Sequence, residues 1–394
     1  MKMAILGCGY VADFYMATLA NYPELALVGA YDVDAQRRSL FSAHHKVKAY
    51  PSFEALLADD AVELVLNLTN PRAHFETTQA CLDANKHVYS EKPLAMDSLG
   101  AGELVRLAHR KGLRLAAAPC SSLGETAQTM WKALNDDAVG PVRLVYASFD
   151  DGMVHRLTPL RWKSESGAPW PAKDEFEVGC TYEHAGYVLS WLAAFFGPAR
   201  RVHAYASRRI EDKGIAVDQM APDFTVGCIE YDNGVVARVT CSIVAPLDKS
   251  ITIIGERGNL YTKYVRNDGS PVYVGQTPPN RYVAGVMSRL GHLRVKLEQL
   301  LRLPFSVSGL TFERKYPYAR KPKFRNSAGN KPVDFLRGPA ELAAAHREGR
   351  PCRLSPELGW HMVELIETLQ HPERFEMPRT LKTAFDPIEP LAWD

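Results

Sequence analysis

The sequence predicts two domains, an α/β domain built on a parallel sheet followed by an α+β domain built on an open, mostly antiparallel sheet. Two observations lead to this fold class. Short apolar runs alternate with helix-like stretches over the first 120 residues, and this alternation is typical of a parallel sheet covered by helices on both faces. From about residue 142, strand-like runs follow one another directly, as they do in antiparallel sheets.

The first domain is expected to span residues 1–121. Each of its strand-like runs is short and apolar throughout, which indicates burial on both faces of the sheet. Strands are predicted at 3–6, 25–32, 62–69, 86–93 and 113–119, and helices at 11–22, 52–60, 74–86 and 101–112.

The second domain is expected to span residues 122–394. Strands are predicted at 142–150, 200–208, 223–231, 234–243, 249–258 and 258–264, and helices at 282–301, 335–348 and 356–370. Asn233-Gly234 lies between two alternating runs and predicts a tight hairpin. Residues 303–333 are rich in Pro, basic and aromatic residues and are expected to form an extended or loop segment. The amphipathic helix at 282–301 is expected to cover an edge of the sheet, with a membrane surface or a partner as the alternative.

The composition is that of a soluble globular protein, with 46% apolar and 23% charged residues. The net charge of +2 gives no indication of nucleic-acid binding. Seven scattered cysteines without a CxxC pair favour a reducing compartment over a disulfide framework or a zinc site. No signal peptide precedes the first strand, and no apolar run reaches about 18 residues. We therefore expect a cytoplasmic protein without a membrane or metal site.

A glycine-rich motif follows the first predicted strand. Gly7 and Gly9 are spaced one residue apart, and Ala12 is the small residue at the start of the next helix. The second strand ends in Asp32, 20 residues after Ala12. Strand, glycine turn, helix and acid together predict dinucleotide binding, in which the acid holds the ribose. Asp32 favours NAD, and the neighbouring Arg37 and Arg38 leave NADP open.

A second motif, Glu91-Lys92-Pro93, lies at the end of the fourth predicted strand. Ligands bind at the carboxyl ends of strands in open α/β sheets. A lysine there can donate a hydrogen bond to a substrate hydroxyl while a hydride leaves the same carbon.

Together these motifs resemble the Gfo/Idh/MocA oxidoreductases, relatives of glucose-fructose oxidoreductase and inositol dehydrogenase. The resemblance rests on "GCGYVA" with Asp32, "VLNLTNPRAH", "SEKPLA" and the "ITIIGERGNLYTKY" hairpin, and it is weakest over about 270–330. It implies a Rossmann domain, then an antiparallel sheet with one face toward the substrate and the other in a homodimer or homotetramer interface.

The resemblance also implies site residues. Those expected to contact the cofactor are Gly7, Cys8, Gly9, Tyr10, Val11, Ala12, Asp32, Leu68, Thr69, Asn70, His74 and Glu91. Lys92 is expected to reach the substrate as the family's catalytic lysine.

The family's second motif, Asp-x-Gly-x-His, is altered in this chain. The matching stretch places Glu183 at the Asp and Tyr187 at the His. A free Tyr has a pKa of about 10, so Tyr187 needs a cation such as Lys92 to act as a base near neutrality. His184 is the alternative acid/base, although on a regular helix it would point about 100° away from Glu183. The choice between His184 and Tyr187 stays open.

A loop rich in Trp and basic residues follows the first strand of the second domain. By resemblance to the family, Arg161, Trp162 and Trp170 are expected to contact a sugar-like substrate.

The predicted function is an NAD(P)-dependent oxidoreductase that acts on a secondary alcohol of a sugar, cyclitol or nucleotide sugar. One alternative is a glycosidase or lyase that retains NAD and oxidises the sugar transiently. Another is a dinucleotide-binding sensor or scaffold without turnover. The substrate, the carbon oxidised, the direction of the reaction and the oligomeric state are not determined by the sequence.

Overall fold

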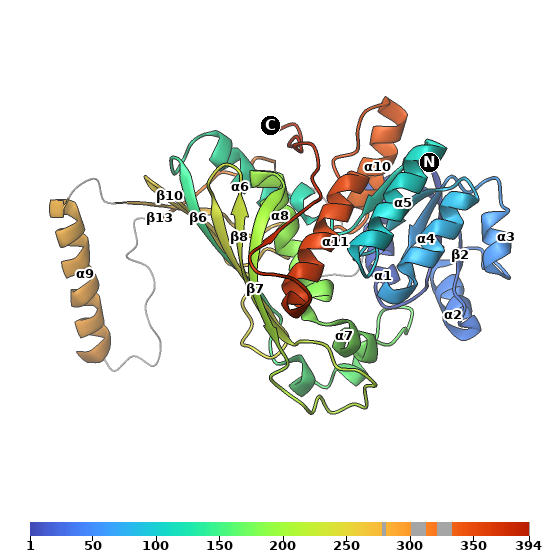
Figure 1. The fold of residues 1–394 in the computed structure, drawn as a ribbon, viewed down its shortest axis with the longest axis horizontal. Coiled ribbons are helices and arrows are strands. Elements are labelled where there is room, and N and C mark those ends of the chain that lie inside the picture. Colours follow the sequence, from blue (N-terminus) through green and yellow to red (C-terminus); the bar gives the residue numbers. More distant parts are fainter. Residues whose placement is uncertain (278–280, 301–312, 321–332, 394) are drawn as a thin grey trace.

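The computed structural model describes residues 1–277, 281–300, 313–320 and 333–393. These residues form two sheets that lie side by side, with a helical layer between them (Figure 1). The first sheet is entirely parallel in the order β2-β1-β3-β4-β5. Its elements are β1 (Lys2–Leu6), α1 (Ala12–Met16), β2 (Ala26–Tyr31), α2 (Ala35–His45), α3 (Phe53–Leu57), β3 (Leu64–Asn67), α4 (His74–Asp83), β4 (His87–Ser90), α5 (Ser98–Lys111) and β5 (Leu115–Ala117).

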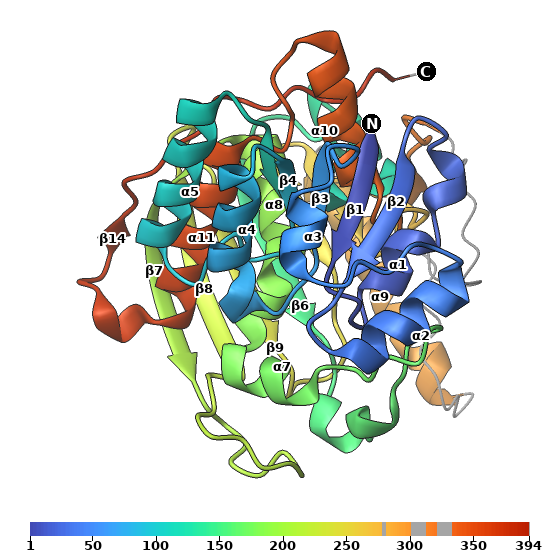
Figure 2. The ribbon, with the colours of Figure 1, turned by 90° about the vertical axis from the view of Figure 1, so that its right-hand side faces the viewer.

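Local signals in the sequence set the ends of several of these helices. Asp34 accepts hydrogen bonds from the first amides of α2, and Ser52 and Asp97 cap α3 and α5 in the same way. Gly112 ends α5 with a φ of 64°. Figure 2 shows α3, α4 and α5 in front of the parallel sheet. The parallel domain predicted from the sequence is thus confirmed.

The second sheet has nine strands within the described residues, in the order β13-β12-β11-β10-β6-β9-β8-β7-β14. All neighbours pair antiparallel except β6 and β9, which are parallel. Its elements and the helices around them are α6 (Glu125–Asn135), β6 (Val142–Asp150), α7 (Ala172–Val178), α8 (Gly186–Phe196), β7 (Ala199–Ser207), β8 (Phe224–Tyr231), β9 (Val236–Ser242), β10 (Ile251–Gly255), β11 (Gly258–Thr262), β12 (Tyr273–Gln276), α9 (Arg281–Leu300), β13 (Glu313–Lys315), α10 (Arg337–Glu348), α11 (Pro356–Gln370) and β14 (Arg379–Thr380). The predicted Asn233-Gly234 hairpin joins β8 to β9, with Gly234 at a φ of 82°.

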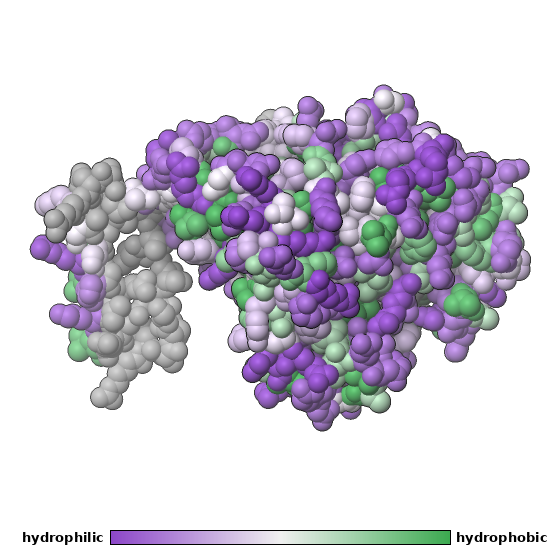
Figure 3. Space-filling model, in the orientation of Figure 1, coloured by the Kyte–Doolittle hydropathy of each residue, from purple (hydrophilic) through white to green (hydrophobic). Residues whose placement is uncertain are grey.

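Helix α9 does not cover an edge of the sheet as the sequence analysis expected. Figure 1 shows it standing apart from the second sheet, and Tyr282, Leu290 and Leu293 remain exposed along it. The space-filling view shows hydrophilic and hydrophobic residues mixed on the coloured part of this helix, and mostly hydrophilic residues on the visible face of the main body (Figure 3). No described helix has the length and apolar character needed to cross a membrane. The expected extended or loop segment 303–333 lies mostly outside the described residues.

The two sheets share one hydrophobic core through the C-terminal helices. Helix α11 lies between the sheets and contacts both α5 and β7. Its Val363 belongs to the cluster beneath α4 and α5, whereas Leu365 and Leu369 belong to the cluster that reaches the second sheet. The helices α10 and α11 therefore belong to the region 122–394 in sequence but also pack against elements of the first domain.

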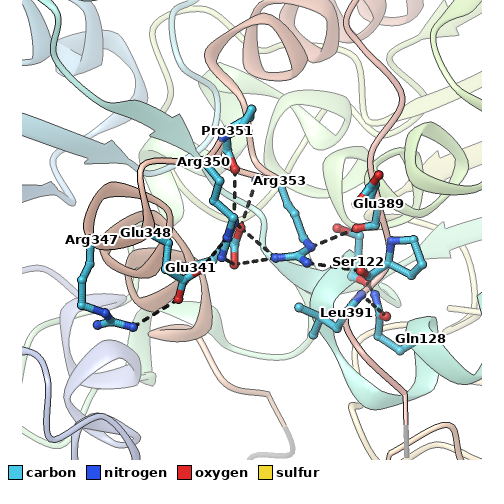
Figure 4. A network of polar contacts seen from close by, with 11 residues as sticks. Ser122, Gln128, Glu341, Arg347, Glu348, Arg350, Pro351, Arg353, Glu389 and Leu391 are labelled. Carbon is cyan, nitrogen blue, oxygen red and sulfur yellow. Dashed lines mark hydrogen bonds and ion pairs between the residues drawn. The ribbon is translucent and has the colours of Figure 1, made fainter.

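A polar network fixes α10 and the C-terminal tail (Figure 4). Glu341 is buried and accepts hydrogen bonds from Arg350 Nη1 at 2.6 Å and from Arg353 Nη1 at 3.1 Å. Arg353 also donates to the backbone oxygen of Glu389 at 3.0 Å. The tail is fastened further by Gln128 of α6, which accepts from the amide of Leu391. One carboxylate thus links α10 to the tail through Arg353.

Replacing Glu341 by Gln is expected to lower the free energy of unfolding by about 2 kcal/mol, because charge-assisted hydrogen bonds to a buried carboxylate are lost. Urea unfolding followed by circular dichroism measures this change. Glu348→Gln is the matched control, since Glu348 pairs with Arg350 at the surface and exposed pairs contribute little. Equal stability of the two variants would contradict the assigned role of Glu341.

Candidate active site

A cleft opens where the strand order of the parallel sheet reverses, between β1 and β3. It has a volume of about 530 Å³ and is lined by both domains. Ligands bind at such switch points in open α/β sheets, outside the carboxyl ends of the strands. The described residues that line it include Gly9, Tyr10, Val11, Arg37, Leu68, Thr69, Asn70, His74, Glu91, Lys92, Asp151, Trp162, Trp170, Asp174, Glu175, Glu183, His184, Tyr187 and Arg266.

The glycine-rich turn forms one wall of the cleft, and its two glycines differ. Gly7 has a φ of 98°, and a Cβ there would lie 2.6 Å from the carbonyl oxygen of Leu68. Gly9 has no atom within 4 Å of the position of a Cβ. The first glycine therefore permits close packing of the turn on β3, and the second leaves its backbone open to the cleft.

Asp32 is hydrogen-bonded to the backbone of this turn. Its Oδ2 accepts a hydrogen bond from the Cys8 amide at 2.7 Å, and its Oδ1 accepts one from the Asp34 amide at 2.8 Å. Arg38 Nη1 donates to the Asp32 backbone oxygen at 2.9 Å, and Arg37 lines the cleft. An open backbone at a helix start, an acid at the end of β2 and a nearby arginine fit a nicotinamide dinucleotide.

The predicted cofactor residues divide into two groups. Gly9, Tyr10, Val11, Leu68, Thr69, Asn70, His74 and Glu91 line the cleft. Gly7, Cys8, Ala12 and Asp32 do not line it. Cys8, Ala12 and Asp32 are buried, and Asp32 accepts a hydrogen bond from the Cys8 amide of the turn.

Lys92 of the first domain contacts Glu183 of the second domain inside the cleft. Its Nζ lies 2.5 Å from Glu183 Oε2, and both side chains are only 14% exposed. Burial alone would lower the pKa of Lys92, but the Glu183 carboxylate outweighs burial and raises it. Burial likewise opposes the charge of Glu183, and Lys92 nevertheless lowers the pKa of that carboxyl. Both groups are therefore charged near neutrality.

The helix that carries the second motif begins with an irregular turn. Residues Thr181–Ala185 form a π-helical turn, and α8 continues from Gly186. Glu183, His184 and Tyr187 all line the cleft, whereas a regular helix would direct His184 away from Glu183. π-Turns are frequent at functional sites. Both candidates for the acid/base group are thus present in the cleft.

His184 is held by two carboxylates that the sequence analysis missed. Its Nε2 contacts Glu175 Oε1, and its Nδ1 lies 3.3 Å from Asp151 Oδ2 without the alignment of a hydrogen bond. Asp151 also pairs with Lys249. Burial would raise the pKa of Asp151, but His184 and Lys249 lower it to about 2. In the sequence, Asp151 could have been found as a candidate site residue because Asp150 and Asp151 follow one another at the end of a predicted strand.

Tyr187 lies between two groups from other elements. The Phe149 ring of β6 stacks on the Tyr187 ring with centroids 5.2 Å apart, and Arg266 Cζ lies 4.8 Å from the ring centre. Burial raises the pKa of Tyr187, although Arg266 and Lys92 act against this. Tyr187 therefore keeps its proton near neutrality. No motif marks Arg266, since it lies in a turn between β11 and β12.

Only two of the three residues predicted to contact the substrate from this loop line the cleft. Trp162 and Trp170 line the cleft with ring centroids 5.2 Å apart, whereas Arg161 is exposed and does not line it. Asp13 of α1 fastens the loop by accepting hydrogen bonds from the amide and hydroxyl of Ser166 at 2.9 and 2.8 Å. His45 Nε2 lies 2.6 Å from the same carboxylate.

The described residues hold no group of three or more His, Cys, Asp or Glu side chains placed to bind a metal ion. His361 of α11, which the sequence left as a packing residue, is buried and accepts a hydrogen bond from the Ala199 amide at 3.0 Å.

Comparisons with known proteins identify both domains. Residues 1–118 match the oxidoreductase family GFO_IDH_MocA, NAD-binding Rossmann fold, and residues 127–261 match the GFO/IDH/MocA C-terminal domain. Trans-1,2-dihydrobenzene-1,2-diol dehydrogenase of Sus scrofa is 25% identical over 262 residues, which are 66% of this chain and 72% of that protein.

Solved structures of low sequence identity share the fold. Aldose-aldose oxidoreductase from Caulobacter crescentus, complexed with glycerol, gives a TM-score of 0.71 at 17% identity, covering 97% of this chain and 99% of that one. The 3-ketoreductase KijD10 from Actinomadura kijaniata, in complex with TDP-benzene and NADP, gives 0.67 at 16% identity, covering 94% and 96%.

Asp13 is expected to make the stability of the protein depend on pH. Burial would raise the pKa of Asp13, but hydrogen bonds from His45 and Ser166 lower it to about 2. A carboxyl with a lowered folded-state pKa stabilises the fold above its unfolded-state pKa of about 4, and this contribution is lost as the pH falls toward 2. Between pH 5 and 2 the wild type should lose about 2 kcal/mol more than Asp13→Asn.

Urea unfolding at a series of pH values measures the difference. Asp60→Asn, which changes an exposed carboxylate, should keep the wild-type dependence. Identical pH dependence of Asp13→Asn and the wild type would show that Asp13 is not ionised in this network.

Proposed function

The chain belongs to the Gfo/Idh/MocA oxidoreductase family, and from this premise we propose that it moves a hydride between NAD(P) and a secondary alcohol of a sugar, cyclitol or nucleotide sugar. The observation that carries the proposal is the meeting of Lys92, Glu183 and Tyr187 in the cleft beside the glycine-rich turn. Oxidation of an alcohol removes a proton and a hydride from the same carbon–oxygen unit, and this arrangement places a phenol that can exchange a proton and a charged hydrogen-bond donor next to a dinucleotide site.

The cofactor is proposed to bind along the wall formed by Gly9, Tyr10 and Val11, with Asp32 at its ribose end. When bound, its nicotinamide supplies the hydride acceptor or donor. The choice between NAD and NADP rests on Arg37, which lines the cleft and lies 3.9 Å from Asp32. Asp32 favours a free ribose hydroxyl, and Arg37 offers a cation to a 2′-phosphate.

Lys92 is proposed to act as a charged hydrogen-bond donor to the reacting oxygen. Because Glu183 raises its pKa, Lys92 does not serve as a base near neutrality. Its ammonium instead stabilises the negative charge that develops on the oxygen as the hydroxyl proton leaves. Glu183 holds the ammonium in place and keeps it charged.

Tyr187 is proposed to carry the proton. Its phenol is protonated near neutrality because burial raises its pKa, so it can donate to a carbonyl oxygen in the direction of reduction. In the direction of oxidation it must accept a proton, and the nearby Lys92 and Arg266 lower the cost of its anion. His184 is the second candidate, since its ring is held between Glu175 and Asp151.

Two further features of the protein, its assembly and its location, are proposed. A homodimer or homotetramer would cover the outer face of the second sheet, where Leu144, Tyr146 and Tyr205 are exposed. A cytoplasmic location is supported by the seven cysteines, none of which forms a disulfide.

Lys92→Met is expected to abolish turnover while NADH still binds, because the variant keeps the bulk of the side chain and removes its charge. Wild-type protein should form NADH with at least one alcohol in a panel of sugars, cyclitols and nucleotide sugars. The variant should lose about 10³-fold or more in kcat/KM on that substrate. Absorbance of NADH follows the reaction, and tryptophan fluorescence follows binding. A fully active variant would exclude the proposed role of Lys92.

Tyr187→Phe and His184→Gln separate the two candidates for the acid/base group. Loss of a general acid or base costs about 10²–10⁴-fold in rate, and we expect this loss in Tyr187→Phe with a smaller effect in His184→Gln. Both are compared by kcat across a pH series at saturating cofactor. The reverse ranking would assign proton transfer to His184.

A further inference from the structure

One cation in the cleft, Arg266, forms no direct ion pair with a described carboxylate, although the charge of Asp151 acts on it. Arg266 lies in the turn after β11 and lines the cleft. Within the ranges that the structure describes, its guanidinium takes part in no hydrogen bond and no ion pair, and its contact is the face of the Tyr187 ring, 4.8 Å from Cζ. Arginine that stacks on an aromatic ring keeps its planar set of N–H donors free at the edge.

The other described cations around the cleft are paired. Lys92 pairs with Glu183, Lys249 with Asp151, and Arg37 with Asp34 at 3.2 Å. Glu91 forms no ion pair with Arg266 and accepts hydrogen bonds from the Tyr15 hydroxyl at 2.8 Å and from the Lys92 amide at 3.0 Å. Arg266 is therefore the one cation of this described set whose N–H donors remain available to a ligand.

The backbone on both sides of Arg266 is anchored. The Val265 amide donates to the Lys249 oxygen at 2.8 Å. The Thr126 hydroxyl of α6 donates to the Asn267 oxygen at 2.9 Å, and Asp268 is buried beside Arg337. The guanidinium is thus presented to the cleft from a fixed turn, which lowers the entropic cost of binding an anion.

We propose that Arg266 binds a carboxylate of the substrate, so that the substrate is a polyhydroxylated carboxylic acid such as a sugar acid. This inference rests on the proposed function, because it places the carboxylate beside Tyr187 and hence close to the reacting carbon. A planar carboxylate matches the paired N–H groups of arginine. Its single charge balances one guanidinium, whereas a phosphate dianion would bring a second charge toward Glu91 and Asp151 without a free cation to receive it.

The test uses the full chain with bound NADH and pairs of probes that differ in the acid group. D-glucuronate and D-galacturonate are compared with D-glucose and D-galactose through the shift in melting temperature and by calorimetry. Wild-type protein is expected to prefer the carboxylates. Arg266→Gln should weaken their binding about tenfold or more without weakening binding of the neutral probes. Lys263→Gln, an exposed change in the same turn, should behave as wild type.

Each contrary outcome has a distinct meaning. If wild-type protein does not bind NADH, the proposed function fails. If NADH binds but the carboxylates bind no better than their neutral partners, the function stands and the role of Arg266 is overturned. Preference for D-glucose 6-phosphate over D-glucuronate also overturns it, as does a loss of NADH affinity in Arg266→Gln, which would assign the guanidinium to the cofactor diphosphate. Arg266→Lys keeps the charge without the planar donors and should bind the acids with intermediate strength.

Discussion

The ion pair between Lys92 and Glu183 is the contact on which the rest of the site depends. Lys92 follows β4 of the first domain, and Glu183 lies in the second, with 2.5 Å between their charged atoms. Each charge is largely removed from water, and an unpaired charge at that depth costs several kcal/mol. The two domains must therefore keep this contact, and the shared core beneath α11 holds them in the same relation. The contact places the glycine-rich turn and the second motif on facing walls of one cleft.

Glu183, His184 and Tyr187 all line the cleft from the π-helical turn at Thr181–Ala185 and the start of α8, although regular helical spacing would direct His184 about 100° away from Glu183. Phe149 of β6 stacks on both the His184 and the Tyr187 rings, with centroids 5.7 and 5.2 Å apart. Backbone irregularity and packing from a distant strand thus combine to present two titratable rings to the same space.

Charge in the cleft is arranged in pairs that reach into the second sheet. Asp151 at the end of β6 contacts both His184 and Lys249, so the environment of His184 depends on residues far away in the sequence. Trp162 and Trp170 line the same cleft, and their loop is held by the hydrogen bond from the Ser166 amide to Asp13. Arg266 forms no hydrogen bond or ion pair among the described residues, so its N–H donors remain available to a substrate that carries its own negative charge.

The sequence by itself determined the two-domain fold, the glycine-rich turn and Lys92, because strand periodicity, turn residues and short motifs are local signals. It also indicated Glu183, Tyr187 and His184 as candidate site residues, but the direction of the His184 side chain could be judged only by assuming a regular helix. Only the tertiary structure showed the π-helical turn, the exposed position of Arg161, and the cleft positions of Glu175, Asp151 and Arg266. These features depend on contacts between β6, the turn after β11 and the motif helix, and residues so far apart in the chain are brought together only by packing and by the pairing of buried charges.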